Sequence, residues 1–230
     1  MKQYAVIGLG RFGSSVARTL NSMGKNVLAI DSEQERVNEM LNYATHCVQA
    51  DSTDIDSLKA LGLRNFDVAI VAIGDDLESS ILTTVLLKEL GVPYVIAKAN
   101  DEMKGKVLEK VGADRIIYPE RDMGVRLAHN ILSSNIMDYL DFAPGYTIME
   151  VEVIGFLAGK TLAELKLRSK YGINVVAIKK NAPAAKVLKK GIASDEVLIS
   201  PGPEAFLEEG DLLIAIGKEE ALRSLGNDID

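Results

Sequence analysis

The amino-acid sequence predicts an α/β protein: a doubly wound parallel sheet, then a connector helix, then a small α+β domain. Three observations predict this. Short apolar runs alternate with helix-patterned runs through residues 1–120. A glycine-rich turn joins the first apolar run to the first helical segment. Beyond Pro144 and Gly145 the pattern changes to apolar–polar alternation, which is typical of a half-exposed strand.

The six runs predicted to be strands in the first part of the chain are short and mostly apolar. Val68–Ile73 contains no polar residue. That pattern is expected where helices cover both faces of a parallel sheet. The runs are Tyr4–Gly8, Asn26–Ile30, His46–Ala50, Asp67–Ile73, Tyr94–Ala99 and Arg115–Tyr118.

The segments between these strands carry helix start and stop signals. Ser32 and Glu35 have the spacing of a capping box, in which each side chain bonds the other residue's backbone N–H. The segments Leu77–Leu90 and Glu102–Val111 each end next to a glycine, which is the common helix stop. Six strands that alternate with such helices predict the doubly wound domain.

The turn after the first strand has the form GxGxxG, with glycines at Gly8, Gly10 and Gly13 around Arg11 and Phe12. In a Rossmann-like fold, the first glycine permits the tight turn and the second lets the backbone approach a phosphate. The third lets the helix pack closely on the strand. Free N–H groups at the start of the helix then face the phosphate. The motif predicts a nucleotide site.

Several residues at other strand ends are candidates for the rest of that site. Asp31 ends the second strand, beside Ser32, and its carboxylate suits the hydroxyls of an unphosphorylated adenosine ribose. The alternative is that Asp31 is a turn residue that starts the next helix. Asp51 and Ser52 are placed beside the adenine, and the adjacent wall is assigned to Ala72, Ile73 and Gly74.

Arg11 is the one charged residue inside the glycine turn. A guanidinium at this place can reach a terminal phosphate of its own nucleotide or of a neighbouring subunit's nucleotide. A solvated surface arginine is the equal alternative on the sequence alone.

Composition excludes several classes of protein. The 230 residues carry a net charge of -7 without a basic run, which argues against nucleic acid as the main partner. Apolar stretches are strand-sized, whereas a membrane-spanning helix needs about 18 apolar residues. A single cysteine, Cys47, excludes an internal disulfide and fits a cytoplasmic protein. Residues 142–230 contain no histidine or cysteine, which argues against a dehydrogenase and for a nucleotide that acts as a signal.

The second part of the chain follows a predicted connector helix at about 120–140, whose broad apolar stripe suits another subunit, the second domain or the chain's own sheet. Residues 141–146 are predicted to be a linker. The domains are therefore expected at 1–141 and 142–230. The second domain is predicted to contain strands at Thr147–Val153, Asn174–Lys179, Glu196–Ser200 and Asp211–Gly217, with helices at Leu162–Leu165 and Glu219–Leu225.

Seven stretches together resemble the KtrA-type regulatory subunits of the bacterial Ktr/Trk potassium uptake systems. Such proteins combine an RCK nucleotide-binding domain (TrkA-N) with a smaller RCK C-terminal domain (TrkA-C). The resemblance covers nearly the whole chain. The stretches are Ala5–Gly13, Arg64–Asp67, Val71–Gly74, Leu86–Leu90, Lys110–Ile117, Pro119–Gly124 and Lys170–Ile173.

The resemblance implies a regulator, not an enzyme: a cytoplasmic octameric ring of dimers, at the inner face of the membrane, bound to a membrane-embedded potassium-translocating subunit. ATP and ADP would compete for the cleft of the Rossmann-like domain. Arg11 would reach the γ-phosphate across a subunit boundary, and Lys98 would be a further phosphate ligand. Glu120 would help to bind a cation at the subunit interface. The alternatives are a Trk-type regulator that responds to NAD(H), and an NAD-dependent oxidoreductase.

The resemblance also implies a second ligand, cyclic di-AMP, in the C-terminal domain. The matching residues are Arg168, Ile173, Asn174 and Pro201. The connection Asn181–Asp195 is longer than the family's usual one.

Overall fold

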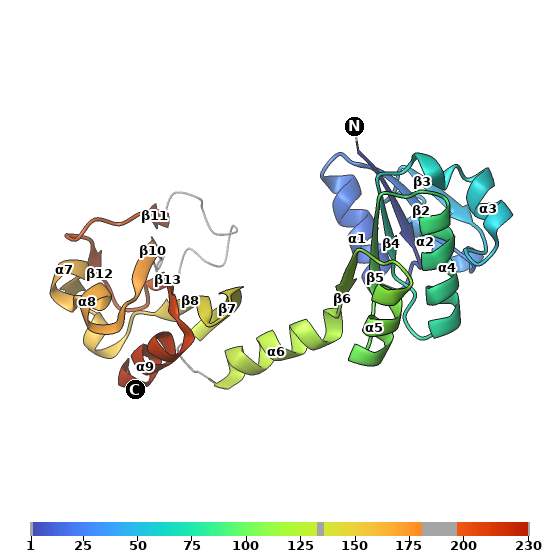
Figure 1. Ribbon diagram of the computed structural model, residues 1–230. Helices are drawn as coiled ribbons and strands as arrows, with labels where there is room; N and C mark the ends of the chain where they lie inside the picture. Colours follow the sequence, from blue (N-terminus) through green and yellow to red (C-terminus); the bar gives the residue numbers. More distant parts are fainter. Residues whose placement is uncertain (1, 133–135, 181–196, 230) are drawn as a thin grey trace. The chain divides into compact units, whose positions relative to one another are not determined.

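The computed structural model describes residues 2–132, 136–180 and 197–229. The chain forms two compact units, Met1–Asp122 and Met123–Asp230. Figure 1 shows the elements of each unit. Within the described ranges, no helix has both the length and the apolar character needed to span a bilayer.

The first unit is built on a six-stranded sheet in the order β3-β2-β1-β4-β5-β6. All its strand pairs are parallel. The order reverses between β1 and β4, which is the place where open α/β sheets bind ligands. The strands are β1 (Gln3–Ile7), β2 (Asn26–Asp31), β3 (His46–Gln49), β4 (Val68–Val71), β5 (Tyr94–Lys98) and β6 (Arg115–Ile117). All six predicted strands are confirmed, with ends that differ by one or two residues.

Helices cover both faces of this sheet (Figure 1). Successive residues of β1 point to opposite faces, so Ile7 packs in one core and Val6 in the other. The first core contains residues of α3, α4 and α5, and the second contains residues of α1 and α2. The helical segments are α1 (Arg11–Ser22), α2 (Gln34–Met40), α3 (Ile55–Ala60), the 3₁₀ turn η1 (Leu63–Asn65), α4 (Leu77–Glu89), α5 (Glu102–Lys110) and α6 (Pro119–Leu132).

The predicted helix stops are confirmed, but the predicted capping box is wrong. Gly91 and Gly112 follow α4 and α5 with φ of 83° and 111°, a conformation that favours glycine. Ser32 does not cap α2, which begins at Gln34 with Glu33 as its N-cap and no side-chain cap. The backbone N–H of Glu33 donates to the Asp31 carboxylate instead, and this bond keeps the chain extended for one more residue.

Asp114 links the turn before β6 to strand β5. Its carboxylate accepts hydrogen bonds from the Val95 backbone N–H, at 2.7 Å, and from the Lys88 ammonium, at 2.9 Å. Partial burial raises the pKa of this carboxyl, but the Val95 and Lys88 bonds outweigh it and hold the pKa below its ordinary value.

We expect Asp114→Asn to lower the free energy of unfolding by about 1 kcal/mol at neutral pH. Because the folded-state pKa is depressed, this stabilisation is present above the ordinary aspartate pKa. It is lost as the pH falls through the folded-state value. Denaturant titrations of both proteins at pH 7 and pH 3 would measure the two differences. Asp56→Asn, at an exposed ion pair with Lys59, is the control and should change little at either pH. An equal loss for Asp114→Asn at both pH values would contradict the assignment.

The second unit is a small α+β domain, as predicted. Its antiparallel sheet has the order β11-β10-β13-β8-β7. Apolar residues of the sheet, including Met149, Val151 and Ile178, form one core with Leu222 and Leu225 of the last helix. The elements are β7 (Ile136–Ala143), β8 (Tyr146–Glu152), the 3₁₀ turn η2 (Gly155–Leu157), β9 (Lys160–Thr161), α7 (Leu162–Leu165), α8 (Leu167–Tyr171), β10 (Asn174–Lys179), β11 (Val197–Ile199), β12 (Phe206–Leu207), β13 (Leu212–Lys218) and α9 (Glu219–Ile229).

The predicted connector helix is wrong from Ile136 onward. Ile136–Ala143 is strand β7, which pairs antiparallel with β8, so Pro144 and Gly145 form a hairpin turn instead of a linker. Residues 136–141, which the sequence assigned to the first domain, therefore belong to the sheet of the second unit. In the remaining helix, α6, the side chains of Val125, Leu127 and Ile131 are exposed.

Candidate functional site

A cleft of about 1450 Å³ lies at the carboxyl ends of the parallel strands in the first unit. Ligand pockets commonly have about 300–1,000 Å³, so this cleft has room for a nucleotide. The structure brings together every predicted residue of the nucleotide site except Gly13, which lies behind the wall. The predicted residues that line the cleft are Gly8, Gly10, Arg11, Phe12, Asp31, Ser32, Asp51, Ser52, Ala72, Ile73, Gly74, Lys98 and Glu120.

The three glycines of the turn have different structural reasons. Gly8 has a φ of +91° and lies against Ala72, where a Cβ would come within 3.0 Å of the carbonyl carbon. A Cβ on Gly13 would lie 1.8 Å from the Gly8 carbonyl oxygen, so only glycine allows this helix–strand contact. A Cβ on Gly10 would meet nothing within 4 Å, and Gly10 lines the cleft. No side chain caps α1, which leaves its first N–H groups to an anion.

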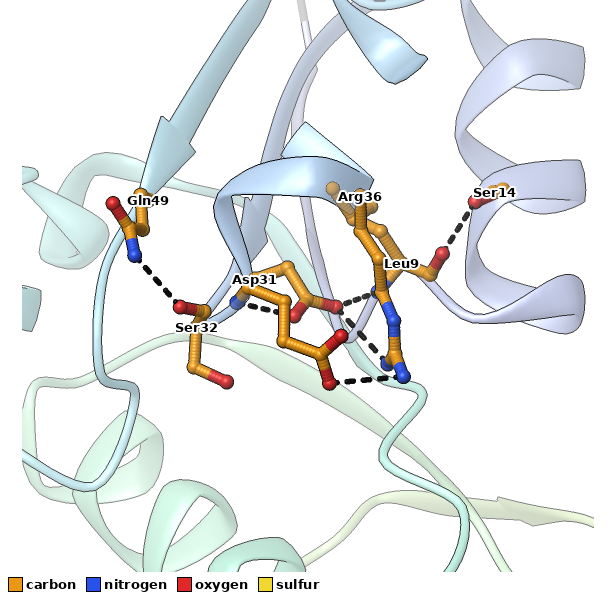
Figure 2. Close-up of polar contacts among 7 residues, drawn as sticks. Leu9, Ser14, Asp31, Ser32, Arg36 and Gln49 are labelled. Carbon is orange, nitrogen blue, oxygen red and sulfur yellow. Dashed lines mark hydrogen bonds and ion pairs between the residues drawn. The ribbon is translucent and has the colours of Figure 1, made fainter. Parts of the chain in front are cut away.

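Asp31 joins the glycine turn to the end of β2 (Figure 2). This side chain is only 5% exposed. Its Oδ2 accepts a hydrogen bond from the Leu9 N–H at 2.6 Å, and its Oδ1 accepts one from the Glu33 N–H at 2.9 Å. The carboxylate therefore serves the local turn and also lines the cleft. A carboxylate has about four lone-pair sites, so acceptor capacity for a ribose hydroxyl remains.

Arg36 is a cleft residue that the sequence prediction missed. Its guanidinium lies 3.7 Å from Asp31 Oδ2 and 3.0 Å from the Glu33 carboxylate (Figure 2). Arg36 and Glu33 have the i, i+3 spacing of a helix-surface ion pair, which was the available signal. The Arg36 guanidinium partly offsets the negative charge of Asp31 and Glu33 at this end of the cleft.

The residues assigned to the adenine side are both held by neighbouring groups. Asp51 Oδ1 accepts hydrogen bonds from the backbone N–H and the hydroxyl of Thr53, at 2.8 and 2.7 Å. The Ser52 hydroxyl pairs with the Thr83 hydroxyl of α4 at 2.8 Å. The loop between β3 and α3 is therefore tied down at the edge of the cleft.

The opposite end of the cleft, beyond β4, is formed by β5 and the start of α6. Lys98 is 8% exposed, and its ammonium donates to Glu120 Oε1 at 2.7 Å. The hydrogen bond from Lys98 holds the pKa of Glu120 below its ordinary value, with a smaller contribution from the nearby Arg11. Within the described parts of the chain, no group of three metal-binding His, Cys, Asp or Glu side chains occurs.

The four residues matched to a second ligand lie in the second unit. Arg168 is on α8, and Asn174 begins β10. Ile173 is 1% exposed and packs in the hydrophobic core. Pro201 follows β11; the preceding Ser200 N–H donates to the Val176 carbonyl, which brings this segment alongside the start of β10. The long connection 181–195 lies outside the described residues.

Two family models match the chain. The TrkA-N domain matches residues 4–119, and the TrkA-C domain matches residues 148–229. Ktr system potassium uptake protein C of Bacillus subtilis (strain 168) is 47% identical over 216 residues, which cover 94% of this chain and 92% of that protein. Ktr system potassium uptake protein A of the same strain is 42% identical over 227 residues, with 99% and 96% covered. The protein A of Vibrio alginolyticus is 38% identical over 221 residues, with 96% and 94% covered.

A solved structure gives the same picture of the fold. The crystal structure of the GsuK RCK domain superposes with a TM-score of 0.52 and 27% identity, over 99% of this chain. The match covers 46% of that longer chain. The likeness therefore extends over both units of this chain.

Proposed function

This chain belongs to the family of proteins that join a TrkA-N domain to a TrkA-C domain, and on that premise we propose that it is a nucleotide-sensing regulatory subunit of a potassium uptake system. Three relatives that match over nearly their whole length are named Ktr system potassium uptake proteins, and these names support the transport role. A regulator of this kind binds its ligand without converting it.

The observation that carries the proposal is the cleft itself, which joins the glycine turn, a buried carboxylate and the cations of Arg11 and Lys98 in one continuous space. An adenosine at the β2 and β3 side would meet Asp31 and Asp51. Its phosphates would then cross the start of α1 at Gly10 and extend toward Arg11 and Lys98. This direction fits ATP and ADP, which differ only at the far phosphate.

Regulation requires that the two nucleotides bind two conformations of the protein with different affinities. The γ-phosphate is the only group that can provide such a difference. We propose that Arg11 contacts it, and that Glu120 helps to hold a cation beside it. In that state the phosphates would compete with Glu120 for Lys98, and the cation would compete with Lys98 for Glu120, two residues that are hydrogen-bonded to each other in the structure.

NAD(H) is a second candidate ligand. The same glycine turn and acidic residue recognise dinucleotides in many Rossmann-like folds, and the cleft volume of about 1450 Å³ accommodates one. A Trk-type regulator that responds to NAD(H) would use the same residues for the adenosine. An NAD-dependent oxidoreductase is the less favoured version.

The assembly is also a proposal. We expect a homo-oligomer, an octameric ring of dimers, in the cytoplasm at the inner face of the membrane, bound to a membrane-embedded potassium-translocating subunit. The exposed apolar face of α6 is available for contacts between copies. Cyclic di-AMP at Arg168, Ile173, Asn174 and Pro201 stays a prediction.

Calorimetric titration of the purified chain with ATP, ADP and NADH would test the proposed ligand. We expect Arg11→Ala to weaken ATP binding about tenfold, because a charge-assisted bond to the terminal phosphate is lost, and to weaken ADP binding about twofold or less. Arg64→Ala, on η1 and outside the cleft, is the matched control and should leave both affinities unchanged. A clear preference of the unchanged chain for NADH over ATP would overturn the ATP-sensing proposal.

A further inference from the structure

Lys104 is a buried lysine directly behind the wall of the cleft. It belongs neither to the glycine motif nor to the proposed contacts with the nucleotide. It is the third residue of α5, and its side chain is 6% exposed. Its ammonium donates to the carbonyl oxygens of Gly74 at 2.7 Å and of Ile73 at 3.3 Å. Both of these residues line the cleft, whereas Lys104 itself does not.

The hydrogen bonds of Lys104 do not explain why a lysine is buried there. The Gly74 carbonyl also accepts a hydrogen bond from the Asn100 side chain at 3.1 Å. The Ile73 carbonyl also accepts one from the Ser80 hydroxyl at 3.2 Å. The Gly74 carbonyl would therefore keep a donor without the lysine, whereas the Ile73 carbonyl would share the Ser80 hydroxyl with the Asp76 carbonyl, which lies 2.7 Å from that hydroxyl.

The charge of Lys104 is poorly compensated. Among the described residues, no carboxylate lies within 4.0 Å of its ammonium. The first turn of a helix also disfavours a cation, because the helix dipole is positive there. Burial lowers the pKa of Lys104, and the neighbouring Lys98 lowers it further, against the weaker opposing effect of Asp75, Asp101 and Asp76.

The two lysines approach the same residue of the cleft. A Cβ on Gly74 would lie 3.8 Å from the Lys98 ammonium, while the Gly74 carbonyl accepts the bond from Lys104. An anion bound at Gly74 would thus be close to both charges. A buried cation without an ion-pair partner is costly, and a bound anion would remove part of that cost.

We infer that Lys104 is a specificity-determining residue: a second cation behind Gly74 whose charge favours the nucleotide with the more negative phosphate chain. The inference rests on the proposed nucleotide site and names a residue that selects between ligands of different charge there. It acts by electrostatic attraction through the wall, without direct contact. Its effect therefore increases with the charge of the ligand.

Titrations of the full chain with adenosine, ADP and ATP would test this inference. We expect Lys104→Met to weaken ATP binding about tenfold, ADP binding about threefold and adenosine binding less than about twofold. Lys106→Met is the matched control, because Lys106 is an exposed lysine of the same helix outside the cleft. It should leave all three affinities nearly unchanged.

A second variant and a second measurement separate charge from structure. Lys104→Gln keeps a hydrogen-bond donor but no charge, so it should behave like Lys104→Met. The thermal midpoint of the ligand-free protein should not fall in either variant, since a buried charge without an ion-pair partner is removed. Unchanged nucleotide affinities in Lys104→Gln would overturn the inference. A lowered thermal midpoint together with unchanged ratios of the ATP, ADP and adenosine affinities would also overturn it, because the role of Lys104 would then be structural. If the unchanged chain binds no ATP, the proposed function itself fails.

Discussion

Gly13→Ala is expected to prevent the first unit from folding correctly, with a loss of about 3 kcal/mol or more in the free energy of unfolding. The added methyl group would lie 1.8 Å from the Gly8 carbonyl oxygen and 3.0 Å from the Gly8 carbonyl carbon. Both are backbone atoms of the turn between β1 and α1, so they have no rotamer with which to move away. Denaturant unfolding, followed by circular dichroism, would measure the loss.

Gly10→Ala is the matched control for that experiment. Gly10 has a φ of -65°, which any residue adopts, and a Cβ there would meet nothing within 4 Å. Its free energy of unfolding should stay within about 0.5 kcal/mol of the original. Nucleotide affinity should fall instead, because the methyl group occupies the part of the cleft proposed for phosphate. If both alanine variants were equally stable, the close packing at Gly13 would be contradicted.

Asp31→Ala is expected to lower both stability and nucleotide binding. The substitution leaves the backbone N–H groups of Leu9 and Glu33 without their acceptor, and the former is buried. Each lost partner costs about 1–3 kcal/mol, so we expect a total loss of about 3 kcal/mol in the free energy of unfolding. Adenosine binding should become undetectable, because the glycine turn loses its connection to β2 along with the proposed ribose acceptor.

Glu33→Ala is the matched control for Asp31→Ala. It removes a neighbouring carboxylate but leaves Asp31 and its two hydrogen bonds to backbone N–H groups in place. The Glu33 side chain is 58% exposed and forms a surface ion pair with Arg36. Its loss should therefore change the free energy of unfolding by less than about 0.5 kcal/mol. Adenosine titration and denaturant unfolding of the two variants form one comparison. If Asp31→Ala unfolded at the same denaturant concentration as the original, its hydrogen bond to Leu9 would not contribute to the fold.

Much of the fold could be predicted because short stretches carry enough local information. The glycines after α4 and α5 end those helices through their own backbone freedom. Strand β10 and helix α7 have the predicted bounds, since apolar runs and helix patterns reflect burial at fixed periods. The glycine turn could be placed because GxGxxG is a local motif between a strand and a helix. Gly13 is constrained by Gly8 of the same turn, and Gly8 is constrained by Ala72 just after β4.

Other features needed partners that are distant in sequence. Residues 136–140 continue a helical pattern, and only hydrogen bonds to β8 across the Pro144–Gly145 turn make them part of a strand. The start of α2 was displaced because Asp31, not Ser32, bonds the local backbone. Burial of Lys104 could not be foreseen, because it results from contact between α5 and the loop after β4, some 30 residues earlier.

The sequence by itself determined the order of elements in the first unit, the glycine turn and the acidic residue that follows it. Only the tertiary structure decided which charges line the cleft, which lie behind its wall, and which are already engaged by other groups. The physical reason is that periodicity and turn chemistry depend on near neighbours along the chain. The environment of a charge depends on every element packed around it, and that environment exists only once the sheet has brought those elements together.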